Sequence, residues 1–266
     1  MWRQYAPYVL IIAALVAVSC KDDDDSDGRF TASEPFAFRT VEHSLIILEL
    51  NAVNGTVEIV GDAESDSVII LAERIVRGNN QHNADEGLQN LQVDVGGSGG
   101  IYFVRTVQSN DIEGNDYEIQ YDITLPQRAR VEVSQINGNI SISSFNYELM
   151  PDYTVRAETM NGNISLTGIQ GSAIAELKNG SLSYATQFAN LDTIDLTIAN
   201  GTINLQIPHE VSADFSAQVS IGTVTVNGLN LSDAIETPTS VTGILGNGDG
   251  RITLRGTNGT ITATGN

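Results

Sequence analysis

The sequence of 266 residues is poor in several residue types that mark particular classes of protein. It has one cysteine, Cys20, so an intramolecular disulfide and a cysteine-rich metal site are both excluded. It has 13 Lys and Arg residues against 33 acidic residues, which gives a formal net charge of −20. Binding to nucleic acid requires clustered Lys and Arg, so this charge balance argues against a nucleic-acid partner.

Histidine and the usual catalytic motifs are scarce as well. His43, His82 and His209 are far apart in the sequence, and we expect them at the surface rather than in a metal site. No Ser-His-Asp order, HExxH motif or Cys-His pair is recognisable. We therefore expect a protein that is not an enzyme and holds no cofactor. The alternative is a glycan-active β-helix protein, which needs several acids and a basic residue around one groove.

The first twenty residues have the pattern of a targeting segment. Arg3 precedes an apolar run over residues 8–18, which is shorter than the roughly 20 residues of a membrane-spanning helix and fits a secretory signal. The run ends in Ala17-Val18-Ser19-Cys20, which resembles the lipobox of bacterial lipoproteins. The resemblance implies that residues 1–19 are a signal peptide and that Cys20 carries the lipid that attaches the protein to a membrane.

A short charged segment follows the cysteine, consisting of Lys21, Asp22, Asp23, Asp24 and Asp25. It resembles the surface-export signal of Bacteroidota lipoproteins, a Lys followed by acidic residues. The resemblance implies an outer-membrane protein whose folded part faces outward. A solvated acidic spacer is the simpler interpretation, and the two are compatible. We expect residues 20–35 to form this lipidated tether.

The tether also matches the spacing of an EF-hand calcium loop, through Asp23, Asp25, Asp27, Gly28 and Glu34. An EF-hand requires a helix on each side of the loop. Only two residues separate the lipidated cysteine from the loop, and a proline follows the loop directly. We therefore expect no calcium site here.

From residue 36 to the end, apolar and polar residues alternate in a way that predicts β-strands, and no long segment has helical periodicity. A glycine-rich stretch over residues 96–100 lies between two such strands. No helix pattern follows it, so we expect a hairpin connection rather than a phosphate-binding loop.

A repeat dominates the second half of the chain. Residues 136–142, Ile-Asn-Gly-Asn-Ile-Ser-Ile, recur in similar form at 160–166, 178–184, 199–205, 220–226, 248–254 and 258–263, with an early copy at 53–59. The first four turn positions of the second half are Asn137, Gly138, Asn161, Gly162, Asn179, Gly180, Asn200 and Gly201. We expect each Asn-Gly to form a tight corner with positive φ, followed by apolar residues that point inward and Ser or Thr that point outward.

A period near 20 residues, made of a turn and a strand, predicts an all-β fold of the β-solenoid or single-stranded β-helix type, because stacked coils bury what one coil cannot. A sandwich of Asn-Gly hairpins is the alternative. The first half has longer strands and variable loops, and it is expected to be sandwich-like. We assign residues 36–266 to one β-strand-repeat domain, with a sub-boundary near residue 126.

The repeated x-Asn-Gly-x-(Ile/Leu/Val)-x-(Ile/Leu) pattern, after a strand that ends in Leu125-Pro126, resembles bacterial β-strand-repeat proteins labelled "putative adhesin". The resemblance covers residues 36–266. It implies a fold and an envelope context for a domain of unknown function, and it supplies no catalytic residues.

Five acids in the repeats lie an even number of positions before the corner glycine, so they are expected on one face: Glu132, Glu158, Glu176, Asp195 and Asp214. We expect a solvated outer row, partly balanced by nearby basic residues, rather than a cation strip. Together these features predict a lipid-anchored outer-membrane protein with an adhesive or assembly role, and a protein or glycan partner at the surface. A periplasmic scaffold or sensor is the further alternative.

Overall fold

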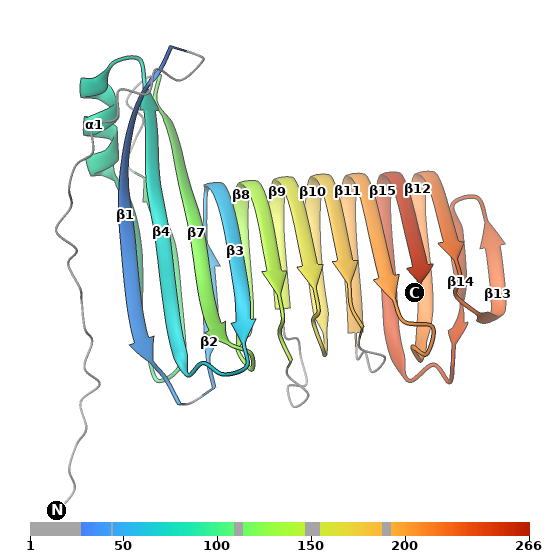
Figure 1. Ribbon diagram of the computed structural model, residues 1–266. Coiled ribbons are helices and arrows are strands. Elements are labelled where there is room, and N and C mark those ends of the chain that lie inside the picture. The colour runs from blue at the N-terminus through green and yellow to red at the C-terminus, as the bar shows by residue number, and fades with distance from the viewer. Residues whose placement is uncertain (1–27, 44, 109–113, 147–154, 188–192) are drawn as a thin grey trace, which may run out of the picture.

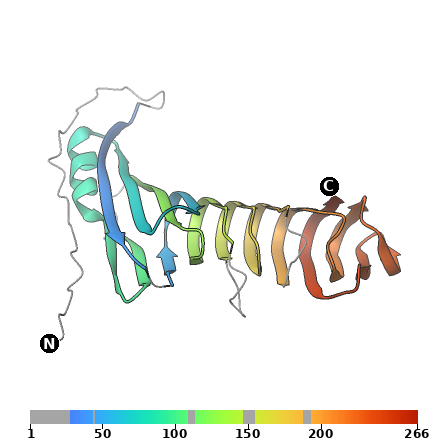
Figure 2. The same ribbon diagram turned by 60° about the horizontal axis from the view of Figure 1, so that its bottom comes forward.

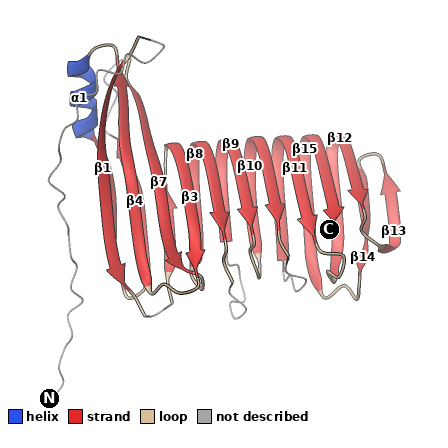
Figure 3. Ribbon diagram, viewed as in Figure 1, coloured by secondary structure: helices blue, strands red, loops and turns tan. Residues whose placement is uncertain are grey.

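The computed structural model describes residues 28–43, 45–108, 114–146, 155–187 and 193–266. Cys20 and the export residues 21–25 lie outside these ranges. The described part is almost entirely β-structure with one helix (Figure 3). The elements are β1 (Phe30–Val41), β2 (Ile47–Asn51), β3 (Asn54–Asp62), β4 (Ser67–Gly78), α1 (Gln81–Asn90), β5 (Leu91–Ser98), β6 (Ile101–Gln108), β7 (Asp116–Pro126), β8 (Arg130–Ser143), β9 (Val155–Thr167), β10 (Ala173–Ala185), β11 (Thr193–Ile207), β12 (Ala213–Asn227), β13 (Leu231–Thr237), β14 (Ser240–Leu245) and β15 (Gly250–Gly265).

The second half of the chain is a β-solenoid, as the repeat predicts. Each of β8, β9, β10, β11, β12 and β15 is one long strand that bends over at its repeat glycine, and each pairs in parallel with its neighbours. The bends line up along the upper edge of the molecule in Figure 1, and Figure 2 shows the coils as a series of hoops. We call the residues before each corner the ascending half and those after it the descending half.

The core lies between the two halves of each coil. In β8 the inward residues are Val131 and Val133 on the ascending half and Ile140 and Ile142 on the descending half, none more than 1% exposed. The unshifted register places equivalent apolar residues of the next coil directly beside them. Burying each such side chain stabilises the fold by about 1.5–3 kcal/mol, so the stack of coils supplies what a single coil lacks.

The first half of the chain continues both layers of the solenoid. Strands β1, β4, β7 and β3 extend the layer of the descending halves, and β5, β6 and β2 extend the layer of the ascending halves. The rings of Phe38 and Tyr102 connect the layers at a centroid distance of 6.3 Å, and the hydroxyls of Thr106 and Tyr121 are 2.9 Å apart. The expected sandwich-like layering is present, but β2 and β3 both pair with β8, so the sheet is continuous.

Burial at this junction affects the Tyr121 hydroxyl. It raises the pKa of that hydroxyl to about 12, against a smaller opposing effect of the hydrogen bond with Thr106. The phenol is protonated at neutral pH, as an ordinary tyrosine is, and its hydrogen bond with Thr106 links the two layers.

The C-terminal strand occupies a place that the order of the repeats does not suggest. Strand β15 lies between β11 and β12, with Gly259 beside Gly201 on one side and Gly222 on the other. The copies at 248–254 and 258–263, which the sequence analysis treated as separate, are the two halves of this single coil. Every coil has the same edge for parallel pairing, so the repeat pattern does not specify which strand pairs with it.

The helix α1 was not expected from the sequence. Its N-terminus is capped by the Asn80 side chain, which accepts a hydrogen bond from the backbone N–H of Asn83 at 2.9 Å, and it packs on β4 and β1. Only Ala84 and Gly87 are buried in it. Two small residues give almost no apolar stripe, so the helical period is nearly invisible in the sequence.

The folded part begins earlier than the expected tether boundary at residue 35. Strand β1 starts at Phe30 and pairs with β4 without interruption to Val41, and Glu34 forms an ion pair with Arg74. Residues 30–35 therefore belong to the sheet. The sequence did not indicate this, because only Ala32 of the six residues is buried and main-chain pairing along one strand does not depend on apolar side chains.

Two smaller expectations are confirmed. The stretch over residues 96–100 belongs to an antiparallel hairpin: residues 96–98 end β5 and pair with β6, and Gly99 and Gly100 form the turn between the two strands. The side chains of His43 and His82 are 79% and 86% exposed, and His209 is exposed. Among the described helices, none has the length and hydrophobicity needed to cross a membrane.

Candidate ligand-facing surfaces

A ladder of asparagine side chains runs along the corner of the solenoid. In each step the Nδ2 of one coil donates to the Oδ1 of the neighbouring coil at 2.7–2.9 Å, in the order Asn54, Asn137, Asn161, Asn179, Asn200 and Asn258. The Nδ2 of Asn54 donates to the carbonyl oxygen of Tyr117 in β7 at 3.2 Å. The ladder ends at the last coil, where Ile221 takes the asparagine position and is 69% exposed.

The glycine that follows each ladder residue makes the corner. At these six glycines, and at Gly222 after Ile221, φ is between +128° and +144°, a region that side-chain-bearing residues rarely adopt. A Cβ on Gly180, for example, would lie 1.7 Å from the carbonyl oxygen of Gly162. The expectation of positive φ is thus confirmed for the glycines. The asparagines have a different role, since they hold neighbouring coils together.

The five acids expected on one face do lie outward, but they do not form one row. Relative to the corner glycine they occupy three different levels, so Glu132 lies beside Arg156 and Asp214 beside Arg251. Only Glu158 and Glu176 are direct neighbours. An even number of residues before the corner glycine places an acid on the outer face. The exact number determines its level along the strand, and the prediction of a single row considered only the face.

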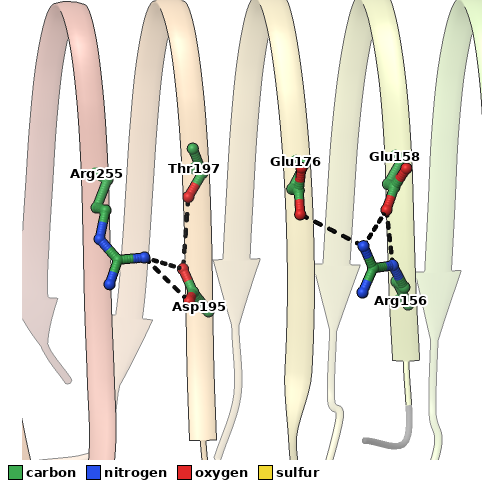
Figure 4. A network of polar contacts seen from close by, with 6 residues as sticks. All are labelled: Arg156, Glu158, Glu176, Asp195, Thr197 and Arg255. Atoms are coloured by element: carbon green, nitrogen blue, oxygen red, sulfur yellow. Dashed lines mark hydrogen bonds and ion pairs between the residues drawn. The ribbon is translucent and has the colours of Figure 1, made fainter.

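Basic residues balance the acids of this surface, which we call the charged face, the outer face of the ascending halves (Figure 4). The Arg156 guanidinium donates to Glu158 at 2.7 Å and lies 3.5 Å from Glu176. The hydrogen bond with Glu158, more than the nearby negative charges, raises the pKa of Arg156. Arg255 donates to both carboxylate oxygens of Asp195 at 3.1 Å. Glu158, Glu176 and Asp195 thus each have an arginine within ion-pair distance. No group of three or more metal-ligating side chains was found in the described residues.

The outer face of the descending halves has a different composition. It presents three outward positions on each of six coils, and the register aligns them into a grid. We call these 18 residues the neutral face: Asn139, Ser141, Ser143, Asn163, Ser165, Thr167, Ser181, Ser183, Ala185, Thr202, Asn204, Gln206, Thr260, Thr262, Thr264, Thr223, Thr225 and Asn227. All carry a hydroxyl or an amide except Ala185, and none carries a charge. They are exposed or half-buried, and their coils lie in front in Figure 1.

The neutral face ends at a hollow of about 660 Å³ on the same side of the molecule. The hollow is formed where β1, β4, β7 and β3 meet β8. Leu71 and Pro35 line its apolar part, and acids return to the surface there with Glu58, Glu73 and Asp122. The absence of charge is therefore a property of the repeated coils and not of the whole layer.

The residues of these surfaces could be identified in the sequence, but not how the fold brings them together. The predicted turn residues, from Asn137 to Gly201, are brought together in one line along the corner. The outward direction of Ser141 and Ser143 is confirmed. The extent of the neutral face was not predicted. The alternation of Ser, Thr or Asn after the Asn-Gly pairs was the signal that could have shown it. The coils at its C-terminal end could not be ordered from the sequence, because their order depends on the placement of β15.

Comparison with known proteins gives a family but no activity. No curated protein matches the chain. Among solved structures, a "putative cell adhesion protein" from Clostridium sporogenes is 13% identical, with 88% of this chain and 100% of that chain covered and a TM-score of 0.42. A "putative adhesin" from Bacteroides fragilis is 12% identical, with 86% and 97% covered and a TM-score of 0.35. These similarities are too low to support an argument about function. The model of the Toastrack DUF4097 family matches residues 82–264, which is most of the chain and nearly all of the solenoid, and the chain therefore belongs to the Toastrack DUF4097 family.

Proposed function

We propose that this protein is a lipid-anchored outer-membrane protein, exported to the cell surface, whose solenoid makes adhesive or assembly contacts without catalysis. The observation that supports the proposal most directly is the pair of long outer faces on a rigidly stacked core. Extended, repetitive surfaces of this kind are what solenoid proteins use for binding. The names given to the two solved structures, a cell adhesion protein and an adhesin, agree with this proposal without carrying it.

The membrane part of the proposal rests on sequence alone. Cys20 lies at the end of the signal-like segment, and Lys21 with the four following aspartates matches a surface-export signal. Replacing Cys20 with Ala should move the protein from the membrane fraction to the soluble fraction, because no acyl chain would then anchor it. Membrane retention of the Cys20→Ala variant would contradict the lipoprotein assignment.

Surface exposure has its own test. Proteolysis of intact cells should remove a protein that faces outward and spare one that faces the periplasm. If the chain is cut only after the outer membrane is permeabilised, a periplasmic scaffold or sensor replaces the adhesin proposal. Deleting the gene should then leave adherence to surfaces unchanged, whereas a surface adhesin should lose it.

A glycan-active β-helix protein remains the second candidate, and the charged face is the observation that favours it. This face holds acids and arginines together, as a sugar-cleaving groove requires, although Asp195 is already paired with Arg255. Incubating the purified protein with acidic polysaccharides distinguishes the candidates. Release of oligosaccharides would establish an enzyme and exclude the non-catalytic proposal.

A further inference from the structure

We propose that the neutral face binds a neutral, hydroxyl-rich polysaccharide laid across the coils. The inference rests on the proposed function as a non-catalytic binding protein, and it names the face and the chemical class of the ligand.

The charge distribution is the first argument. The chain has a formal net charge of −20, yet none of the 18 positions of the neutral face is acidic or basic. The outer face of the same coils' ascending halves carries acids and arginines. Solubility and folding require only polar side chains on an outer face, and charged residues meet that requirement equally well. A surface without charge can form no ion pair with an ionic ligand, whereas its hydroxyl and amide groups can form hydrogen bonds with a neutral one.

The hydrogen-bonding chemistry is the second argument. Hydroxyl and amide groups both donate and accept hydrogen bonds, as do the hydroxyls of a sugar. Neighbouring strands are about 4.8 Å apart, and outward residues along one strand are about 6.6 Å apart, so the grid repeats in two directions. A polymer with repeating hydroxyls matches such a surface better than a single small molecule does.

Side-chain length is the third argument. Ser, Thr and Asn have few rotatable bonds, so immobilising them on a ligand costs less conformational entropy than immobilising Lys, Arg or Glu. The coils beneath them have an unbroken register through β12, and they hold the groups at fixed spacing. The face is therefore organised for contact before the ligand arrives.

The neutral face has no aromatic side chain, so the contacts are hydrogen bonds rather than stacking on rings. Each contact is weak because it replaces a hydrogen bond to water. Binding should therefore be of low affinity for one molecule and strengthened by many copies on one surface. It should also be nearly independent of ionic strength, because no ion pair contributes.

Native gel electrophoresis of the detergent-solubilised full chain in gels that contain a polysaccharide is the test. The neutral probes are dextran, starch, mannan and mixed-linkage β-glucan, and the acidic probes are alginate and polygalacturonate. We expect retardation by at least one neutral probe, with less than a twofold change in apparent Kd between 50 and 500 mM salt, and none by the acidic probes.

Two matched variants locate the site. Asn163→Lys/Asn204→Lys places two long charged side chains on the neutral face and should raise the apparent Kd at least tenfold. Ser134→Lys/Gln218→Lys makes the same charge change at exposed positions of the charged face and should change it less than twofold. If the first variant fails to fold, Thr202→Lys/Thr223→Lys replaces it on the same face. Both positions of each pair are exposed in the folded chain.

The inference fails if no neutral probe retards the wild-type chain, if retardation occurs only with acidic probes or disappears in salt, or if both matched variants bind equally. Surface proteolysis and membrane fractionation are scored separately. A surface-exposed, membrane-anchored protein that binds no neutral polysaccharide would refute this inference and leave the proposed function standing.

Discussion

The two outer faces of the same coils differ although they share one backbone. In coil β9, the ascending half presents Arg156 and Glu158, and the descending half presents Asn163, Ser165 and Thr167. Both halves alternate with buried residues and both are paired in parallel. The alternation of apolar and polar residues determines which side chains face outward, but it does not determine whether they carry a charge. Alternation alone therefore does not explain why charge is confined to one face.

The difference also shows how each face is stabilised. The charged face has ion pairs between neighbouring coils. The neutral face is stabilised by the core beneath it, by the corner above it and by a side-chain hydrogen bond from Asn163 to Asn139 at 2.9 Å. Substitutions at the corner should thus affect both faces together, and substitutions on a face should affect that face alone.

The largest effect is expected at the corner that joins the faces. Gly180→Ala should destabilise the protein by about 3 kcal/mol or more, because the new Cβ would lie 1.7 Å from the Gly162 carbonyl oxygen in a backbone region that is strained for alanine. Guanidinium unfolding measures the change.

Gly168→Ala is the matched control. Gly168 has φ of +61°, and its nearest neighbouring atom would be 3.9 Å from a new Cβ. Only the backbone strain of about 1–2 kcal/mol applies there. Equal losses in the two variants would show that the stacked corner is not the constraint.

A smaller effect is expected within the asparagine ladder. Asn179→Ala removes two hydrogen bonds, to Asn161 and Asn200, each 2.9 Å long. At about 0.5–1.5 kcal/mol for each bond, the free energy of unfolding should fall by about 1–2 kcal/mol. Asn204→Ala, on the neutral face and outside the ladder, should change it by less than about 0.5 kcal/mol. A loss at Asn204 as large as at Asn179 would remove the distinction between corner and face.

The charged face alone should respond to the loss of Arg156. Arg156→Ala leaves Glu158 and Glu176 side by side without their shared cation, and we expect a loss of about 1 kcal/mol that shrinks in 0.5 M salt. Ser165→Ala, on the neutral face of the same coil, should be nearly without effect and independent of salt. Thermal unfolding at two salt concentrations tests both. A salt-independent loss in Arg156→Ala would mean that packing, not charge, is responsible.

The smallest effect is expected where charges return beyond the neutral face, at Glu118 in β7. Burial is the largest single effect on the pKa of Glu118 and raises it. The hydrogen bonds from Arg77 at 2.8 Å and Gln120 at 2.9 Å, with the positive charge of Arg77, together outweigh burial, so the pKa of Glu118 is lowered. A lowered folded-state pKa stabilises the protein above the unfolded-state pKa of about 4.3, and that stabilisation is lost as pH falls through the folded-state pKa.

Glu118→Gln should therefore cost less than about 1 kcal/mol at pH 7 and almost nothing at pH 3. Urea unfolding of both proteins at the two pH values measures the difference. An equal cost at both pH values would show that Glu118 contributes through its shape and not its charge.

The fold class could be predicted from sequence because its determinants are local. Alternation at residues such as Ile140, Ser141 and Ile142 specifies a strand and its inward side, and Gly138 specifies the corner. The helix α1 escaped notice because only two small residues of it are buried. The early start of β1 escaped notice because only one of its first six residues, Ala32, is buried, and main-chain pairing with β4 holds the strand.

The candidate surfaces were less predictable than the fold. The acids of the repeats were assigned to one face correctly, but their levels depend on the number of residues before each corner, which separates Glu132 from Glu158. The asparagines were assigned to backbone conformation, because a side-chain ladder appears only when the coils are stacked.

By itself, the sequence determined an all-β repeat protein with apolar residues inside the coils, glycine at every corner and a lipoprotein-like N-terminus. Only the tertiary structure decided the order of the coils, the insertion of β15 between β11 and β12, the asparagine ladder and the separation of a charged from a neutral face. The physical reason is that alternation and turn chemistry act between neighbouring residues. Parallel strand pairing acts between distant ones, and every coil presents an edge that many partners fit.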